Sequence, residues 1–103
     1  MYKIVFFVPV DHLDRVKSAL FDAGAGKLGS YDCCAWQTLG QGQFRPLEGS
    51  QPHIGEQGCM AVVDEYRVEM VCSDHCVRAA VAALRASHPY EEPAFDIWSL
   101  AKF

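Results

Sequence analysis

The first quarter of the chain carries a hydrophobic pattern that predicts a strand followed by a helix. Residues 3–8 form an apolar run rich in strand-forming side chains, which is typical of a central strand. Asp11 is a favourable N-cap for the helix that follows. The apolar positions of this helix recur at helical spacing and are Leu13, Val16, Leu20 and Ala23. Gly24 and Gly26 end it, because glycine readily adopts the left-handed conformation of a helix stop.

The middle of the chain contains two strand patterns separated by a stretch without any period. Residues 31–38 are predicted to form a second strand, and residues 66–72 a third, in which apolar positions alternate with Arg67 and Glu69. The segment 40–58 holds five glycines and two prolines, and neither a helical nor a strand period survives in it. We expect a long loop or an irregular hairpin arm there.

The last third of the chain predicts a second helix followed by a short strand. Ser73 is the expected N-cap, and the helix should end near Ser87, since Pro89 disfavours a helical residue before it. The apolar stripe of this helix consists of Val77, Ala80, Val81 and Leu84. Residues 93–100 are predicted to form the final strand.

These elements follow the order β-α-β, β-α-β, which predicts one α+β domain over residues 1–103. Two such halves with right-handed crossovers form a ferredoxin-like sandwich, in which a four-stranded antiparallel sheet carries both helices on one face. The other face of the sheet would expose aromatic side chains. We expect self-association through that face or its edges to cover them.

Charge and composition narrow the classes of function. Nine Lys and Arg residues against 13 Asp and Glu residues give a net charge of −4, which argues against nucleic-acid binding through phosphate neutralisation. A small anionic ligand is still compatible with this charge, because one arginine and a few backbone amides suffice to hold it. No stretch resembles a signal peptide or a membrane span, and five cysteines do not suggest a disulfide framework. We therefore expect a cytoplasmic protein with reduced thiols.

The segment 88–93 is the first candidate site. The imidazole of His88 and the carboxylates of Glu91 and Glu92 are suitable ligands for a divalent metal ion. Adjacent residues of an extended chain point to opposite sides, so at most one of the two glutamates is expected to join His88. The alternative interpretation is a rigid helix-to-strand connector between two prolines, with Tyr90 in the core.

The segment 40–58 is the second candidate site, because a loop of this length is uncommon in so small a domain. The predicted ligand-binding residues are Gly40, Gly42, Phe44, Arg45 and Tyr90. The glycines let backbone amides approach a ligand closely, the arginine suits a phosphate or carboxylate, and the phenylalanine suits stacking on a ring. His53, in the same segment, is a candidate partner for His88 across a subunit boundary. The alternative is an arm that packs on a neighbouring subunit.

Three sequence segments together resemble a known protein family. They are Val8-Pro9 with the later turn Gly24-Ala25-Gly26-Lys27-Leu28-Gly29-Ser30-Tyr31, the segment Gly40–Ser50, and His88-Pro89-Tyr90-Glu91-Glu92-Pro93-Ala94. In combination they resemble the domain inserted in the middle of many Nif-three-like proteins, here standing alone. The last segment also resembles one in CutA, the divalent-ion tolerance protein, whose ferredoxin-like fold is related to the PII signalling proteins.

The resemblance implies a CutA-like fold and a homotrimer, since CutA proteins assemble as trimers. Full-length Nif-three-like proteins bind two metal ions through His, Asp and Glu residues of the domains that flank the insert. Those domains are absent from this sequence. The resemblance therefore implies that a metal-centre or hydrolase activity of the family would concern parts outside this chain.

We expect a non-catalytic binding or regulatory module, a CutA-like oligomer that holds a divalent metal ion or a small anion at clefts between subunits. One alternative is a small metal-assisted hydrolase that uses His88 with Glu91 or Glu92 on a phosphate or a cyclic amide. Another alternative is an interaction domain that acts on a Nif-three-like partner. Neither nucleic acid nor a membrane is an expected partner.

Overall fold

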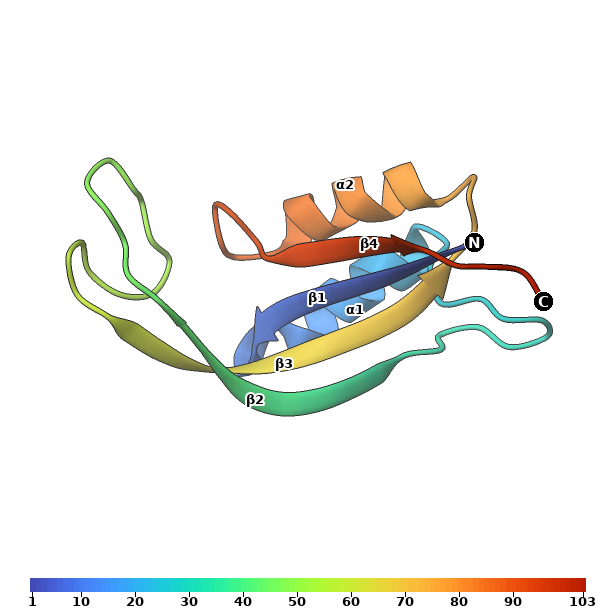
Figure 1. The fold of residues 1–103 in the computed structure, drawn as a ribbon, viewed down its shortest axis with the longest axis horizontal. Coiled ribbons are helices and arrows are strands. Elements are labelled where there is room, and N and C mark those ends of the chain that lie inside the picture. Colours follow the sequence, from blue (N-terminus) through green and yellow to red (C-terminus); the bar gives the residue numbers. More distant parts are fainter.

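The computed structural model describes residues 1–103 and contains four strands, two α-helices and one short 3-10 helix. In chain order they are β1 (Tyr2–Pro9), the 3-10 helix Val10–His12, α1 (Leu13–Asp22), β2 (Trp36–Phe44), β3 (Ala61–Cys72), α2 (Val77–Ser87) and β4 (Phe95–Ser99). The sheet order is β2-β3-β1-β4, and every neighbouring pair is antiparallel. Both helices lie on one face of the sheet, which confirms the predicted ferredoxin-like sandwich (Figure 1).

The core lies between the helices and one face of the sheet. β1 has a strand on each side, and its alternate residues Ile4, Phe6 and Val8 are fully buried. The residues of α1, β3 and α2 that complete the core are Leu13, Val16, Leu20, Val68, Met70, Cys72, Ala80 and Leu84. The predicted core positions of β1, α1 and β3 therefore form the core, except Ala23, which is the C-cap of α1, and Tyr66, which is only partly buried.

The N-termini of both helices differ from the prediction. α1 begins only after the 3-10 helix that contains Asp11, and no side chain caps it. α2 begins at Val77 with Cys76 as its N-cap, so Ser73 is not the cap. The Ser73 carbonyl instead accepts a hydrogen bond from the Cys76 amide at 3.1 Å, which holds residues 73–76 in a turn before the helix.

The C-termini of both helices agree with the prediction. Gly24 has a φ of 105°, and its amide donates a hydrogen bond to the Phe21 carbonyl at 3.0 Å, as expected where glycine ends a helix. α2 ends at Ser87, and His88 has extended backbone ahead of Pro89. Neither helix combines the length and the apolar character that crossing a membrane requires.

The hairpin formed by β2 and β3 is longer than predicted. β2 begins five residues later than expected and includes Gly40 and Gly42, whereas β3 begins five residues earlier. The far ends of the two strands, Phe44 and Ala61, pair with each other, and residues 45–60 connect them beyond the sheet (Figure 1). Glycine disfavours strands, but β3 supplies backbone hydrogen-bond partners along the whole length of β2. The segment is thus a hairpin arm rather than one long loop.

The sheet face opposite the helices carries charged and aromatic side chains. The guanidinium of Arg67 lies 5.8 Å from the centroid of the Phe7 ring and 5.9 Å from that of Trp98. Its Nε donates to Glu69 at 3.2 Å, and Lys3 Nζ lies 3.8 Å from the other carboxylate oxygen. These groups cover the middle of the face, while the Trp98 side chain stays exposed.

Candidate functional site

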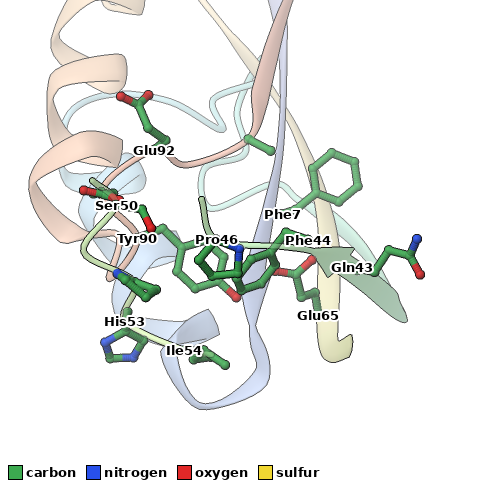
Figure 2. A pocket seen from close by; sticks show the side chains of 14 residues that line it. Phe7, Gln43, Phe44, Pro46, Ser50, His53, Ile54, Glu65, Tyr90 and Glu92 are labelled. Atoms are coloured by element: carbon green, nitrogen blue, oxygen red, sulfur yellow. The ribbon is translucent and has the colours of Figure 1, made fainter. Parts of the chain in front are cut away.

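A pocket of about 460 Å³ lies between the hairpin arm, the end of β1 and the connection from α2 to β4 (Figure 2). Its apolar lining consists of Phe7, Phe44, Pro46, Pro52, Ile54 and Ala94. The remaining lining residues are Gly42, Gln43, Ser50, His53, Glu65, Tyr90, Glu91 and Glu92. Three segments far apart in the sequence therefore build one cavity, which has the apolar walls and few polar groups of small-molecule sites.

A hydrogen bond between Tyr90 and Glu65 organises the polar side of the pocket. The Tyr90 hydroxyl donates to Glu65 Oε2 at 2.9 Å, which joins the α2–β4 connection to β3. Burial, followed by the hydrogen bond and the negative charge of Glu65, raises the pKa of Tyr90 far above its usual range. The phenol therefore stays protonated and keeps donating to the carboxylate.

His88 packs against Tyr90, with ring centroids 4.9 Å apart, and has only 6% of its surface exposed. Its Nδ1 accepts a hydrogen bond from the Tyr90 amide at 3.1 Å, so its Nε2 carries the proton and donates to the Phe7 carbonyl at 2.7 Å. Burial lowers the pKa of His88, and His12 and His53 lower it further, against the opposing effects of the Phe7 carbonyl and Glu65. His88 is thus a neutral imidazole with both nitrogen atoms engaged.

We predict that the protein loses stability as the pH falls below about 6.5 through the titration of His88. The folded-state pKa of His88 lies below the 6.5 of a free histidine, so the unfolded chain takes up a proton first. Above that pH the two states are equally deprotonated and His88 adds no pH dependence. Below it, the free energy of unfolding decreases by at most about 1.4 kcal/mol per pH unit until the folded state is protonated too. Urea unfolding at a series of pH values measures this.

The control for this prediction is His88→Gln, because glutamine offers one donor and one acceptor but does not titrate. The other ionisable groups are the same in both proteins, so the difference between their stability curves isolates His88. Parallel curves from neutral pH down to about pH 5 would contradict the prediction.

The loop at the tip of the hairpin arm, residues 45–60, contacts the α2–β4 connection. The Gln51 amide donates to Glu91 Oε1 at 2.9 Å. The ring of His53 lies edge-on to that of His12, with centroids 5.3 Å apart, and 6.3 Å from that of Tyr90. These contacts place the loop as one wall of the pocket.

Gly42 is required by the position of the Glu65 side chain. Glu65 pairs with Gly40, and Gly42 is the next residue of β2 on the same face of the sheet, two pairs along the β2–β3 register. A Cβ atom on Gly42 would overlap the Glu65 carboxylate, with Oε1 as its nearest neighbour. By contrast, nothing lies within 4 Å of a Cβ atom built on Gly40. The missing side chain of Gly42 therefore allows Glu65 to reach Tyr90.

The structure brings together some of the predicted ligand-binding residues. Gly42, Phe44 and Tyr90 line the pocket, and the rings of Phe44 and Tyr90 have centroids 5.9 Å apart. Gly40 and Arg45 do not line it. The contribution of glycine amides and of an arginine to ligand binding therefore remains a prediction.

The predicted metal ligands do not gather around one point. Glu91 and Glu92 line the pocket, and Glu92 points away from the Tyr90 and Glu65 side chains in Figure 2. His88 does not line the pocket, and it has no nitrogen lone pair free. No group of three or more His, Cys, Asp or Glu side chains in the chain is arranged to hold a metal ion. Metal binding by this segment also remains a prediction.

Two residues central to the pocket were not predicted as site residues. Phe7 belongs to a strand whose apolar run predicts core packing, and Glu65 precedes the predicted start of its strand. Only the pairing of the strands places both residues beside Tyr90. One signal was present in the sequence, since two glycines alternating in a strand indicate that another group approaches the backbone closely.

Comparison with known proteins identifies relatives that are much longer than this chain. No protein-family model matches the chain. The GTP cyclohydrolase 1 type 2 homolog of Halalkalibacterium halodurans is 46% identical over 101 residues, which cover 98% of this chain and 27% of that protein. The protein of the same name from Mycobacterium tuberculosis is 46% identical over 98 residues, 95% of this chain and 26% of that protein. The chain thus spans about a quarter of the length of these relatives.

Solved structures show the same correspondence. A Bacillus cereus protein related to NIF3 superposes with a TM-score of 0.83 and 39% identity over 98% of this chain and 26% of that one. CutA from Xylella fastidiosa gives a TM-score of 0.70 with 19% identity over 99% of this chain and 85% of that one, which is a likeness of fold. In sequence and in fold, the chain therefore corresponds to the CutA-like domain of the Nif-three-like proteins.

Proposed function

We propose that this chain is a non-catalytic binding module that assembles with copies of itself and holds a small ligand in the pocket beside Tyr90. The observation that carries the proposal is the Tyr90–Glu65 hydrogen bond, which fixes a carboxylate inside an aromatic cavity built from three distant segments. A cytoplasmic location fits the five free thiols, because reduced cysteines are usual there.

A divalent metal ion or a small anion, the two ligands expected from the sequence, would need residues from a second copy of the chain. His88 has no free nitrogen, and the pocket lining contains no Arg or Lys. We therefore place such a ligand at a cleft between subunits, where side chains of a second copy complete the site.

Self-association is supported by the aromatic side chains on the open face of the sheet. Trp36 is 59% and Trp98 46% exposed, and both stand on the side opposite the helices. The two indoles lie on the opposite edge strands β2 and β4, and exposed aromatic side chains are typical of protein interfaces. The similarity in fold to CutA makes a homotrimer the favoured assembly.

We predict that sedimentation of the wild-type protein at micromolar concentration gives the mass of an oligomer, and that Trp98→Asp shifts it to monomer. The substitution removes the large apolar surface of the indole and puts a carboxylate, which is costly to desolvate, at the interface, so assembly should weaken. Leu28→Asp is the matched control, because Leu28 is 55% exposed but lies in the loop before β2. A wild-type protein that sediments only as monomer would refute the proposed assembly.

The hydrolase alternative finds no support in the site, because both nitrogen atoms of His88 are already hydrogen-bonded. The activity in the name of the curated relatives belongs to proteins of which this chain spans about a quarter. An interaction with a Nif-three-like partner is favoured by one observation, since the related segment occurs in those proteins with the rest of their chain. Copurification with a relative from which this domain has been deleted tests it.

A further inference from the structure

The pocket is negatively charged. Its lining contains three carboxylates, Glu65, Glu91 and Glu92, and no Lys or Arg. Glu91 and Glu92 are exposed and Glu65 is half-buried, so the attraction of the lining for a cation comes chiefly from Glu65, whose charge is screened least beside the apolar walls. The charge of the lining therefore discriminates between ligand classes.

Glu65 is the carboxylate best placed to contact a ligand. Its Oε2 accepts the hydrogen bond of Tyr90, whereas its Oε1 has no hydrogen-bond partner within the chain and lies over Gly42. Each carboxylate oxygen has two lone pairs, so both can accept from a ligand in addition. The side chain is held in place before any ligand arrives, which lowers the entropy cost of binding.

The walls of the pocket suit a flat molecule. Phe7, Phe44 and Tyr90 contribute aromatic rings, and Pro46 and Pro52 contribute apolar faces without flexible side chains. Aromatic rings attract cations through their negative faces and stack on planar groups. A planar ligand with a delocalised positive charge uses both properties of the lining.

We propose that this pocket binds a planar organic cation that presents paired N–H donors, of the amidinium or guanidinium kind, to the carboxylate of Glu65. The flat part of the ligand lies against the aromatic and prolyl walls, and its N–H groups donate to Oε1 and Oε2. This inference rests on the proposed function, in which the pocket is a ligand site, and it adds the chemical class of the ligand.

Three probes of nearly identical shape and different charge test the inference. Benzamidinium is the planar cation, benzamide its neutral counterpart and benzoate its anion. Titration of each into the wild-type protein, followed by amide NMR, should show benzamidinium binding with a dissociation constant on the order of 1 mM, as its size predicts. The shifted amides should include those of Gly42, Glu65 and Tyr90. Benzamide should bind at least tenfold more weakly and benzoate not measurably.

The role of Glu65 is tested by Glu65→Gln, which keeps the shape of the side chain and removes its charge. Benzamidinium binding should weaken about tenfold or more. Asp64→Asn is the matched control, since Asp64 is the preceding residue of β3, is exposed and does not line the pocket. It removes the same charge and should leave the dissociation constant within about twofold, because exposed charges are screened.

The possible outcomes test separately whether the pocket binds a ligand at all and whether that ligand is a cation. If all three probes bind equally, or benzoate binds best, the pocket is a ligand site but its ligand is not a cation. If none of the probes shifts the pocket amides, the proposed function of this cavity fails with the inference. If Asp64→Asn weakens binding as much as Glu65→Gln, the effect is one of overall charge and the assignment to Glu65 is wrong.

Discussion

Replacement of His88 by alanine should lower the free energy of unfolding by about 3 kcal/mol. The substitution removes a buried ring and leaves two partly buried backbone groups, the Phe7 carbonyl and the Tyr90 amide, without the imidazole as their partner. Each unsatisfied buried group costs about 1–3 kcal/mol, and the vacated volume adds to this. Chemical denaturation at pH 8, where the imidazole of the wild type is neutral, measures the loss without a contribution from titration.

Two variants show whether this loss arises from the hydrogen bonds of His88. His88→Gln can keep a donor and an acceptor, so it should cost clearly less than alanine. His75→Ala removes an exposed histidine from the turn before α2 and should change stability by less than about 0.5 kcal/mol. The interpretation is wrong if His88→Ala proves no more costly than His75→Ala.

Replacement of Gly42 by valine should abolish ligand binding in the pocket, although valine is a far better strand residue than glycine. The new Cβ atom takes the space of the Glu65 carboxylate, which must leave its position beside Tyr90. The hydroxyl of Tyr90 then loses its partner, and its pKa should fall toward the usual value of a tyrosine. Benzamidinium titration and ultraviolet absorbance titration of the tyrosines measure the two effects.

Gly40→Val provides the control within the same strand and on the same face. A Cβ atom at Gly40 meets nothing within 4 Å, so valine should be tolerated there and improve the strand propensity of β2. Ligand binding and the Tyr90 titration should remain as in the wild type. Equal behaviour of the two valine variants would show that Glu65 does not depend on the missing side chain of Gly42.

The elements that were predicted correctly are those in which local and tertiary preferences agree. The apolar run of residues 3–8 forms the central strand, and the period of α1 places Val16 and Leu20 in the core. The stop of α1 at Gly24 and the end of α2 before Pro89 depend on the conformations that these two residue types allow.

The elements that were predicted poorly depend on partners that are distant in the sequence. β2 contains Gly40 and Gly42, which disfavour a strand locally, and it exists because β3 pairs with it along nine positions. The prediction of Ser73 as the N-cap of α2 was wrong for a similar reason. The chain forms a turn between the end of β3 and the start of α2, and Ser73 belongs to that turn. Local residue preferences indicate neither the pairing with β3 nor the turn before α2.

The same contrast applies to the candidate site. Phe44 and Tyr90 were recognised from their residue types in two separate segments, and the structure places their rings 5.9 Å apart. Arg45 follows Phe44 in the sequence but lies beyond the end of β2 and does not line the pocket. Glu65 lacked any local signal and became part of the site only through the register of β3 with β2.

The order of the elements and the core faces of the central strands and of the first helix could be predicted from the sequence, because they depend on periodicity among neighbouring residues. The likeness to the CutA-like domain of Nif-three-like proteins could be predicted too, because short sequence motifs carry it. The tertiary structure decided that His88 is a structural hydrogen-bonding residue with no lone pair to offer, and that Glu65 faces an aromatic cavity. Which groups meet in space depends on strand register and chain closure. These are properties of pairs of residues far apart in the sequence, such as Tyr90 with Glu65, 25 positions apart, and His88 with Phe7, 81 positions apart.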